Sequence, residues 1–427
     1  MQVQVSIESL YRRHAPRVRA TLIRRLGDFD AAEEAMHDAF AAAVARWPGE
    51  GVPDAPVAWL IRVGHRRGID QIRRRQTARQ HAHLLVPDEG EGEEARDIAD
   101  DPLRLLFTCC HPALSMSDRL ALTLREMAGL TTEQVASALL QRPASLAQRI
   151  VRAKRRLRNA GIPYEVPDAA ELPTRLPGVL GVIYLIFNEG YSCSDGDRVV
   201  DVHLADEAIR LGEALADLLP QGEVFGLLAL MRLHHARREA REDARGELVP
   251  LEEQDRRRWD ARQIQAGMAW LERALALTPT DPYTLQASIA AVHAQAGSAE
   301  ATDWRRIVML YGALQQRQPS PVIELNRAVA VAMHDSPEAG LALLEALAEH
   351  HQLVDYHLFH AARADLHRRA GHREAARHAY ERALALTVQE PERRFLERRL
   401  AELEALAPGD AALPPSVGAA HGRGSPA

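Results

Sequence analysis

Arginine and amide side chains near residue 150 form the group in this sequence best suited to specific chemistry. Residues 144–158 contain five Arg, one Lys and no acidic residue. A guanidinium pairs bidentately with guanine and an amide with adenine in the major groove, while further cations hold phosphates. The candidates are Ser145, Gln148, Arg149, Arg152, Arg155 and Arg156. We expect Gln148 and Arg149 to meet base edges and the later arginines to meet phosphates.

Two helices joined by a tight turn would position these side chains. Thr131 followed three residues later by Gln134 is a capping-box signal, and Pro143 suits the first turn of a second helix. Apolar residues at helical spacing would face a core on the opposite side: Leu146, Ile150, Ala153 and Leu157. The pattern predicts a helix-turn-helix over residues 131–158. A solvated basic helix in an all-α protein is the alternative.

A second basic segment begins at Pro56. Residues 62–79 contain seven Arg and one acid, Asp70. Such a segment neutralises phosphates, and an aromatic side chain can stack on an exposed base. The candidate contacts are Trp59, Arg62, His65, Arg66, Arg67, Arg73 and Arg74. By itself the run is also compatible with a solvated helix face.

An amphipathic helix is expected between Asp30 and Trp47, ending at Pro48, after a first helix over residues 10–27. Its apolar face includes Phe40, and its polar face includes Glu34, His37 and Asp38. That polar face is either a wet helix side or a docking surface for a protein.

Composition limits the class of protein. The chain has 427 residues, enough for two or three domains, and a net charge of −6, so its basic character is local. No run approaches the ~18 apolar residues of a membrane span, and the N-terminus lacks a signal-peptide core. Its three cysteines (109, 110 and 193) suit a reducing compartment, and Cys109-Cys110-His111 lacks zinc-site spacing. We expect a cytoplasmic, all-α protein without a metal, a cofactor or catalytic activity.

Two stretches divide the basic segments from each other and from the rest. Residues 87–101 hold eight acids and one Arg, which predicts a flexible acidic linker over 81–102. Residues 161–177 are rich in proline and predict a second linker. The flanking segments, 5–80 and 103–160, would each form a small helical domain.

These two domains resemble the extracytoplasmic-function group of bacterial RNA polymerase sigma factors. The resemblance rests on Trp59-Leu60, Ile69-Asp70 and Arg73-Arg74, and on the segment from Ala32 to Phe40. Gly64-His65-Arg66 departs from the commoner Ala-Arg-Asn. The resemblance implies that residues 5–80 bind the polymerase core and the −10 element, and that residues 103–160 read the −35 element. It also implies that Glu34, His37, Asp38 and Phe40 dock on the β′ clamp of the core.

Residues 178–407 are predicted to form a helical extension. The clearest unit, 356–387, places small and aromatic residues as a tetratricopeptide repeat does, and 268–297 is a weaker copy that shares ERALALT. The whole resembles the sigma-factor subgroup with a long C-terminal extension of tetratricopeptide-like repeats. Its motif residues here are Asn188, Glu189, Gly190, Tyr191, Asp255 and Trp259. Residues 408–427 would be a disordered tail.

The function implied is promoter recognition with polymerase core, without a membrane, and regulated by contact between the extension and the sigma domains. One alternative is a stand-alone helix-turn-helix regulator with a repeat-type sensor domain. Another is an enzyme housed in residues 170–260, with a pocket around Asn188, Glu189 and Asp255. A separate hypothesis is a metal site, for which four residues offer oxygen ligands: Asn188, Glu189, Asp195 and Asp197. The same four residues also suit helix caps and turns.

Overall fold

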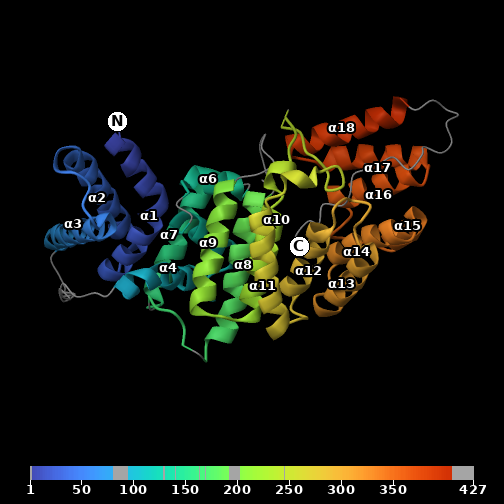
Figure 1. Cartoon of the computed structure of the whole chain (residues 1–427). Coiled ribbons are helices and arrows are strands. Elements are labelled where there is room, and N and C mark those ends of the chain that lie inside the picture. Colours follow the sequence, from blue (N-terminus) through green and yellow to red (C-terminus); the bar gives the residue numbers. More distant parts are fainter. Residues whose placement is uncertain are drawn as a thin grey trace. The chain divides into compact units, whose positions relative to one another are not determined.

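The computed structural model describes residues 2–79, 95–127, 130–139, 141–162, 164–168, 170–191, 202–244 and 246–405. In these ranges the regular structure is helical, apart from one isolated bridge between Glu242 and Leu248. The chain forms two compact units, residues 1–182 and 183–427, and the division falls inside helix α8. The expected all-α class is confirmed (Figure 1).

Three helices open the first unit: α1 (Gln2–Leu26), α2 (Phe29–Glu50) and α3 (Pro56–Arg79). The Asp28 side chain caps α2 by accepting from the backbone N–H of Asp30 and Ala31. The expected end at Pro48 is wrong, because α2 runs through it to Glu50. A proline in the last turn removes only one backbone bond, and Gly51, with φ 85°, then closes the helix.

Two glycines allow α3 to cross its neighbours closely. A Cβ on Gly68 would lie 2.4 Å from Leu26 Cδ1, and one on Gly64 would lie 3.2 Å from the Ala35 carbonyl oxygen. Small residues four apart lie on the same face of a helix, so this face approaches α1 and α2. The Gly at position 64, which departs from the commoner Ala, therefore has a packing role.

Five further helices complete this part of the chain: α4 (Ala95–Cys109), α5 (Met116–Glu126), α6 (Thr132–Ala138), α7 (Pro143–Asn159) and α8 (Leu172–Tyr191). Both expected linkers are therefore partly helical. Residues 95–102 belong to α4, and α8 begins inside the expected 161–177 linker and contains Pro177. Leu172 and Leu176 are buried, so apolar packing outweighs the proline-rich composition. The remainder of the predicted acidic linker, residues 81–94, lies outside the described residues.

The helices of the second unit beyond α8 are α9 (Val202–Leu218), α10 (Gly222–His235), α11 (Ala261–Leu277), α12 (Pro282–Gln295), α13 (Trp304–Arg317), α14 (Pro321–His334), α15 (Pro337–Glu345), α16 (His357–Arg369), α17 (Arg373–Leu386) and α18 (Glu390–Ala405). Two short 3₁₀ helices, η1 (Arg238–Ala240) and η2 (Arg256–Arg258), lie between α10 and α11. Helices packed as sequential pairs include α10 with α11, α12 with α13, α14 with α15, and α16 with α17 (Figure 1).

The two ERALALT segments end the second helix of their pairs, α11 and α17. The expected copy 268–297 therefore spans the end of one pair and the start of the next, one helix out of phase with 356–387. Within 356–387 the predicted small and aromatic positions do pack. Ala364, Ala376 and Ala383 are fully buried, Tyr380 is 1% exposed, and Gly371 makes the turn with φ 75°.

The longest apolar run in the described residues lies in α8. No described helix combines the length and hydrophobicity needed to cross a membrane. The predicted tail, residues 408–427, lies outside the described residues.

Candidate nucleic-acid interface

Helix α7 separates its two faces as predicted. The capping box forms, because the Thr131 N–H donates to Gln134 Oε1 at 2.8 Å and the Gln134 N–H donates to Thr131 Oγ1 at 3.2 Å. Pro143 occupies the first turn of α7, and the four predicted core residues are buried. The other face exposes Ser145, Gln148, Arg152, Arg155 and Arg156, with Arg149 partly exposed. This basic face carries no carboxylate of its own.

Asp118 is a partner of this face that the sequence did not reveal. It lies in the first turn of α5, where Oδ1 is 3.9 Å from Arg149 Nε and Oδ2 is 3.7 Å from Arg156 Nη1. These distances are long for hydrogen bonds, so the carboxylate orients the two guanidinium groups without fixing them. Both arginines remain able to turn toward a nucleic acid.

Lys154 departs from the rest of the α7 basic residues. Its side chain is 7% exposed, and Nζ lies 3.1 Å from Glu126 Oε1 and 3.1 Å from Asp30 Oδ1. Burial opposes the charge, but the carboxylates of Glu126 and Asp30 outweigh it and raise the pKa of Lys154. Arg19 Nη1 reaches Glu126 Oε2 at 3.4 Å from the other side. We call Arg19, Glu126 and Lys154 the buried ion cluster.

Ion pairs around this cluster join the helix-turn-helix to α2. Arg158 Nη2 lies 2.8 Å from Asp28 Oδ2, and Arg125 pairs with Glu33. Tyr164 adds a further link, because its hydroxyl donates to the Ala20 carbonyl oxygen of α1 at 3.0 Å. The two basic segments thus belong to one compact unit, with α2 contacting α5 and α7.

Helix α3 presents most of its predicted contact residues at the surface. Arg62, Arg66, Arg67, Arg73 and Arg74 are exposed, and His65 is partly exposed. Trp59 packs against Trp47 at 5.3 Å between ring centroids and is partly exposed, so only part of its ring is available for base stacking. The surface is basic and suited to phosphate contact.

The predicted docking residues on α2 are not equivalent. Glu34 and His37 are exposed, whereas Phe40 is 5% exposed and packs on Tyr11 at 4.8 Å. Asp38 accepts a hydrogen bond from Gln71 at 3.2 Å and lies 3.8 Å from Arg67. Phe40 therefore packs in the core under α2, and the three polar residues, Glu34, His37 and Asp38, form the accessible face.

The extension motif forms an arginine–aromatic network in the second unit. Tyr191 is buried, and the Arg241 guanidinium carbon lies 3.6 Å from its ring centroid while Nη1 donates to the Tyr191 carbonyl oxygen. Arg256 stacks on Trp259 at 4.8 Å. Asp255 caps η2 by accepting from the Arg257 N–H at 3.0 Å.

Two partly buried histidines, His234 and His293, lie at the same network. Burial and the nearby Arg237 hold the pKa of His234 well below its ordinary value. Burial, with Arg237 and Arg256, lowers the pKa of His293 to about 3. Both rings are therefore neutral at physiological pH, and the network packs arginine guanidinium groups against aromatic ring faces.

The metal alternative finds no support in these ranges. Among the described residues, no three His, Cys, Asp or Glu side chains gather to hold a metal ion. Asn188 and Glu189 are partly exposed at the end of α8, and Asp195 and Asp197 lie outside the described residues. Cys109 and Cys110 are buried free thiols, and burial raises the pKa of Cys110 to about 12.

Family models match two parts of the chain. The model for sigma-70 region 2 matches residues 10–78, which contain α2 and α3. A family of unknown function (DUF6596) matches residues 175–275. No solved structure matches the chain.

Curated relatives cover both halves. An uncharacterized protein of Rhizobium meliloti (strain 1021) is 44% identical over 399 residues, which is 91% of this chain and 94% of that protein. The ECF RNA polymerase sigma factor SigK of Mycobacterium sp. (strain KMS) is 30% identical over 160 residues, 35% of this chain and 80% of SigK. The probable ECF sigma factor SigI of Mycobacterium tuberculosis (strain H37Rv) is 25% identical over 203 residues, 46% of this chain and 66% of SigI.

The chain matches sigma-70 region 2, and this match is followed by a helix-turn-helix whose second helix, α7, has no acidic residue. Together these features place it in the sigma-70 class of sigma factors. Within that class the chain belongs to the ECF RNA polymerase sigma factors. It carries in addition a long helical C-terminal extension.

Proposed function

We propose that this sigma factor directs RNA polymerase core to promoters, contacting the −10 element through α3 and the −35 element through α7. We further propose that residues 178–407 set its activity through contact with the sigma domains. The exposed basic face of α7 is the observation that carries the proposal, because it offers amide and guanidinium groups at a helix surface. Residues 5–80 and 103–160 remain the proposed sigma domains.

Transcription in vitro tests this function directly. The full chain, added to polymerase core and genomic DNA fragments, should produce transcripts with defined start sites, and it should co-purify with core. A chain that binds DNA alone and neither binds core nor directs transcription would be a stand-alone regulator instead.

Arg149→Ala should reduce affinity for the cognate −35 element by about 1–3 kcal/mol and relax base preference at one position. The side chain is 30% exposed and is held only loosely by Asp118. Binding of holoenzyme to a library of −35 variants measures both effects. Arg155→Ala is the matched control, because an exposed phosphate contact should weaken all sequences equally. Uniform weakening by Arg149→Ala as well would make Arg149 a phosphate contact.

Asp38→Lys should weaken binding to polymerase core by about tenfold or more. Asp38 is half exposed, and its pair with Arg67 at 3.8 Å is too exposed to matter greatly for stability. Affinity is measured with labelled core, and circular dichroism checks the fold. Asp54→Lys, on the exposed loop after α2, makes the same charge change as a control. Equal affinities for all three chains would remove Asp38 from the docking surface.

Removing the extension should change transcription, in either direction, much more than it changes the folding of the first unit. The shortened chain should end at residue 191 and so keep α8, because Arg175 of α8 donates to the Phe107 carbonyl oxygen at 2.8 Å and stacks on that ring. Transcript yield is compared at equal core occupancy, and hydrogen exchange in α1–α7 reports the folding. A shortened chain that transcribes as the full chain does would refute regulation by the extension.

A further inference from the structure

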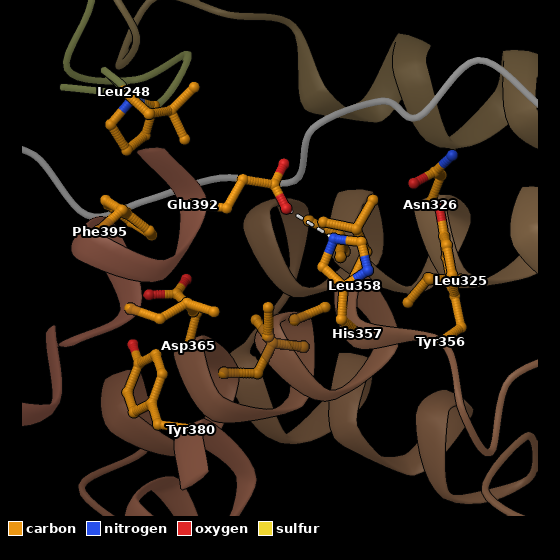
Figure 2. A pocket seen from close by; sticks show the side chains of 16 residues that line it. Leu248, Leu325, Asn326, Tyr356, His357, Leu358, Asp365, Tyr380, Glu392 and Phe395 are labelled. Carbon is orange, nitrogen blue, oxygen red and sulfur yellow. Dashed lines mark hydrogen bonds and ion pairs between the residues drawn. The ribbon is translucent and has the colours of Figure 1, made fainter. Parts of the chain in front are cut away.

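A pocket opens in the second unit between helices α14, α16 and α18 and the loop at Leu248 (Figure 2). Its volume is about 80 Å³ for the centres of water-sized molecules, within about 820 Å³ of empty space that includes open solvent. One buried water needs roughly 10–15 Å³ by the same measure, so the pocket has room for a small organic group. Its lining residues are far apart in the sequence, from Leu248 to Leu396, and are brought together only by the fold.

The floor of the pocket is apolar. Leu325 and Leu366 are 3% and 1% exposed, and Phe395 and Leu396 of α18 also line the pocket. Val329 lies one turn beyond Leu325 on α14 and continues the same surface. An apolar group that enters here removes its surface from water against side chains that are already packed.

The carboxylates that line the pocket already have partners. Asp365 Oδ1 accepts from Arg368 at 2.7 Å, and its Oδ2 accepts from Arg369 at 2.8 Å. Glu392 Oε2 lies 2.7 Å from His357 Nε2, the contact drawn in Figure 2. A charged ligand group would lose its hydration without gaining an unpaired counter-charge, so burying it here would cost free energy.

Two uncharged polar groups remain to orient a ligand. The partly exposed Asn326 amide lies across the pocket from Asp365, Tyr380 and Phe395 in Figure 2. Its side chain offers both a donor and an acceptor, which matches another amide. The Tyr380 hydroxyl is buried near Arg368, and no described residue gives it a hydrogen bond of good geometry.

We propose that this pocket binds one small uncharged ligand that combines an apolar group with an amide. The apolar group fills the space between Leu325, Leu366 and Phe395, and the amide pairs with Asn326. This assignment concerns binding by the extension alone and does not depend on promoter recognition. The extension would then be a domain that binds a small molecule.

Three probes that share one ring test the chemistry on the full chain: N-acetylphenylalaninamide, N-acetylphenylalanine and phenylalaninamide. The first is uncharged and has two amides, and each of the other two keeps one amide and replaces the other by a carboxylate or an ammonium. We expect saturable binding of the uncharged probe by calorimetry or ligand-observed NMR, with both charged probes about tenfold weaker or more. Equal affinity for all three, or no saturable binding of the uncharged probe, would overturn the proposal.

Two variants locate the binding. Asn326→Leu keeps the side-chain volume and removes the amide, so it should weaken the uncharged probe about three- to tenfold. Ala361→Phe fills the pocket from α16 and should abolish binding. Gln352→Leu, an exposed amide outside the lining, is the matched control and should bind as the parent does. Binding unchanged in both pocket variants would place the probe elsewhere.

A capped Ala-Phe-Ala peptide distinguishes a small ligand from a peptide segment with the same chemistry. We expect it to bind no more tightly than the single capped residue, because Leu248 and Pro250 cover one side of the pocket. An affinity more than about tenfold higher would overturn the small-molecule assignment in favour of a peptide partner.

Discussion

Replacing Glu126 by Gln is expected to lower the free energy of unfolding of the helix-turn-helix by about 3–5 kcal/mol. The Glu126 side chain is fully buried and lies 3.1 Å from Lys154 Nζ and 3.4 Å from Arg19 Nη1. Without its charge, two nearly buried cations lose their common counter-charge. Among the residues that the structure describes, the acidic side chains that remain within 4 Å of Lys154 are Asp30, which is 62% exposed, and Glu33. Burial of an uncompensated charge outweighs what those two contacts supply.

Hydrogen exchange of peptides from α5 and α7 measures this loss within the full chain, because it reports stability segment by segment. Asp30→Asn is the matched control. It removes the exposed partner of the same lysine, and it should cost less than about 1 kcal/mol, as exposed ion pairs do. If Glu126→Gln accelerates exchange no more than Asp30→Asn does, the Glu126 charge does not stabilise the helix-turn-helix to the extent predicted.

The sequence predicted the α7 surface well because the signals are local. The Thr131–Gln134 capping box, Pro143 in the first turn and apolar side chains at helical spacing all act within one or two turns. Each was confirmed. Lys154 was different, since it lies among arginines in sequence but is buried against Asp30, 124 positions away. No local pattern identifies such a partner.

Predictions from composition placed several helix boundaries wrongly for a related reason. Proline at position 48 or 177 lowers helix propensity, yet both lie inside helices whose apolar faces are buried. Repeat phase was also ambiguous, because ERALALT marks the second helix of a pair and not the start of a repeat. The pocket was not predictable, since Asn326 and Tyr380 come from different helices and only the fold brings them together.

The contact between α2 and the helix-turn-helix has a consequence for the proposed function. Elements named for positions −10 and −35 are 25 base pairs apart, which is about 85 Å at 3.4 Å per pair. Helices α3 and α7, with 24 and 17 residues, would span only about 60 Å if laid end to end. In the structure, however, α7 contacts α2 through Arg158 and Asp28 at 2.8 Å. If α3 and α7 read both elements at once, as proposed, we expect this contact to open.

A covalent lock across that contact should abolish transcription from promoters that need both elements. Cysteines at positions 28 and 158, in a background with Cys193→Ser, are joined by a short bis-maleimide with a cleavable disulfide spacer. Cys109 and Cys110 are buried thiols, and burial raises their pKa, so they should not react. Run-off transcription with polymerase core is measured before locking, after locking and after reduction of the spacer.

Reduction of the spacer should restore the activity of the unlocked double variant. That variant is the proper reference, because Asp28→Cys also removes the cap of α2, which costs about 1 kcal/mol whether or not the lock is closed. Single-cysteine chains treated with the reagent control for modification alone. If the locked chain still binds core and transcribes as the reduced chain does, the two sigma domains read their promoter elements without separating. Loss of transcription with core binding retained would instead place the defect at the DNA, as the span of the two elements requires.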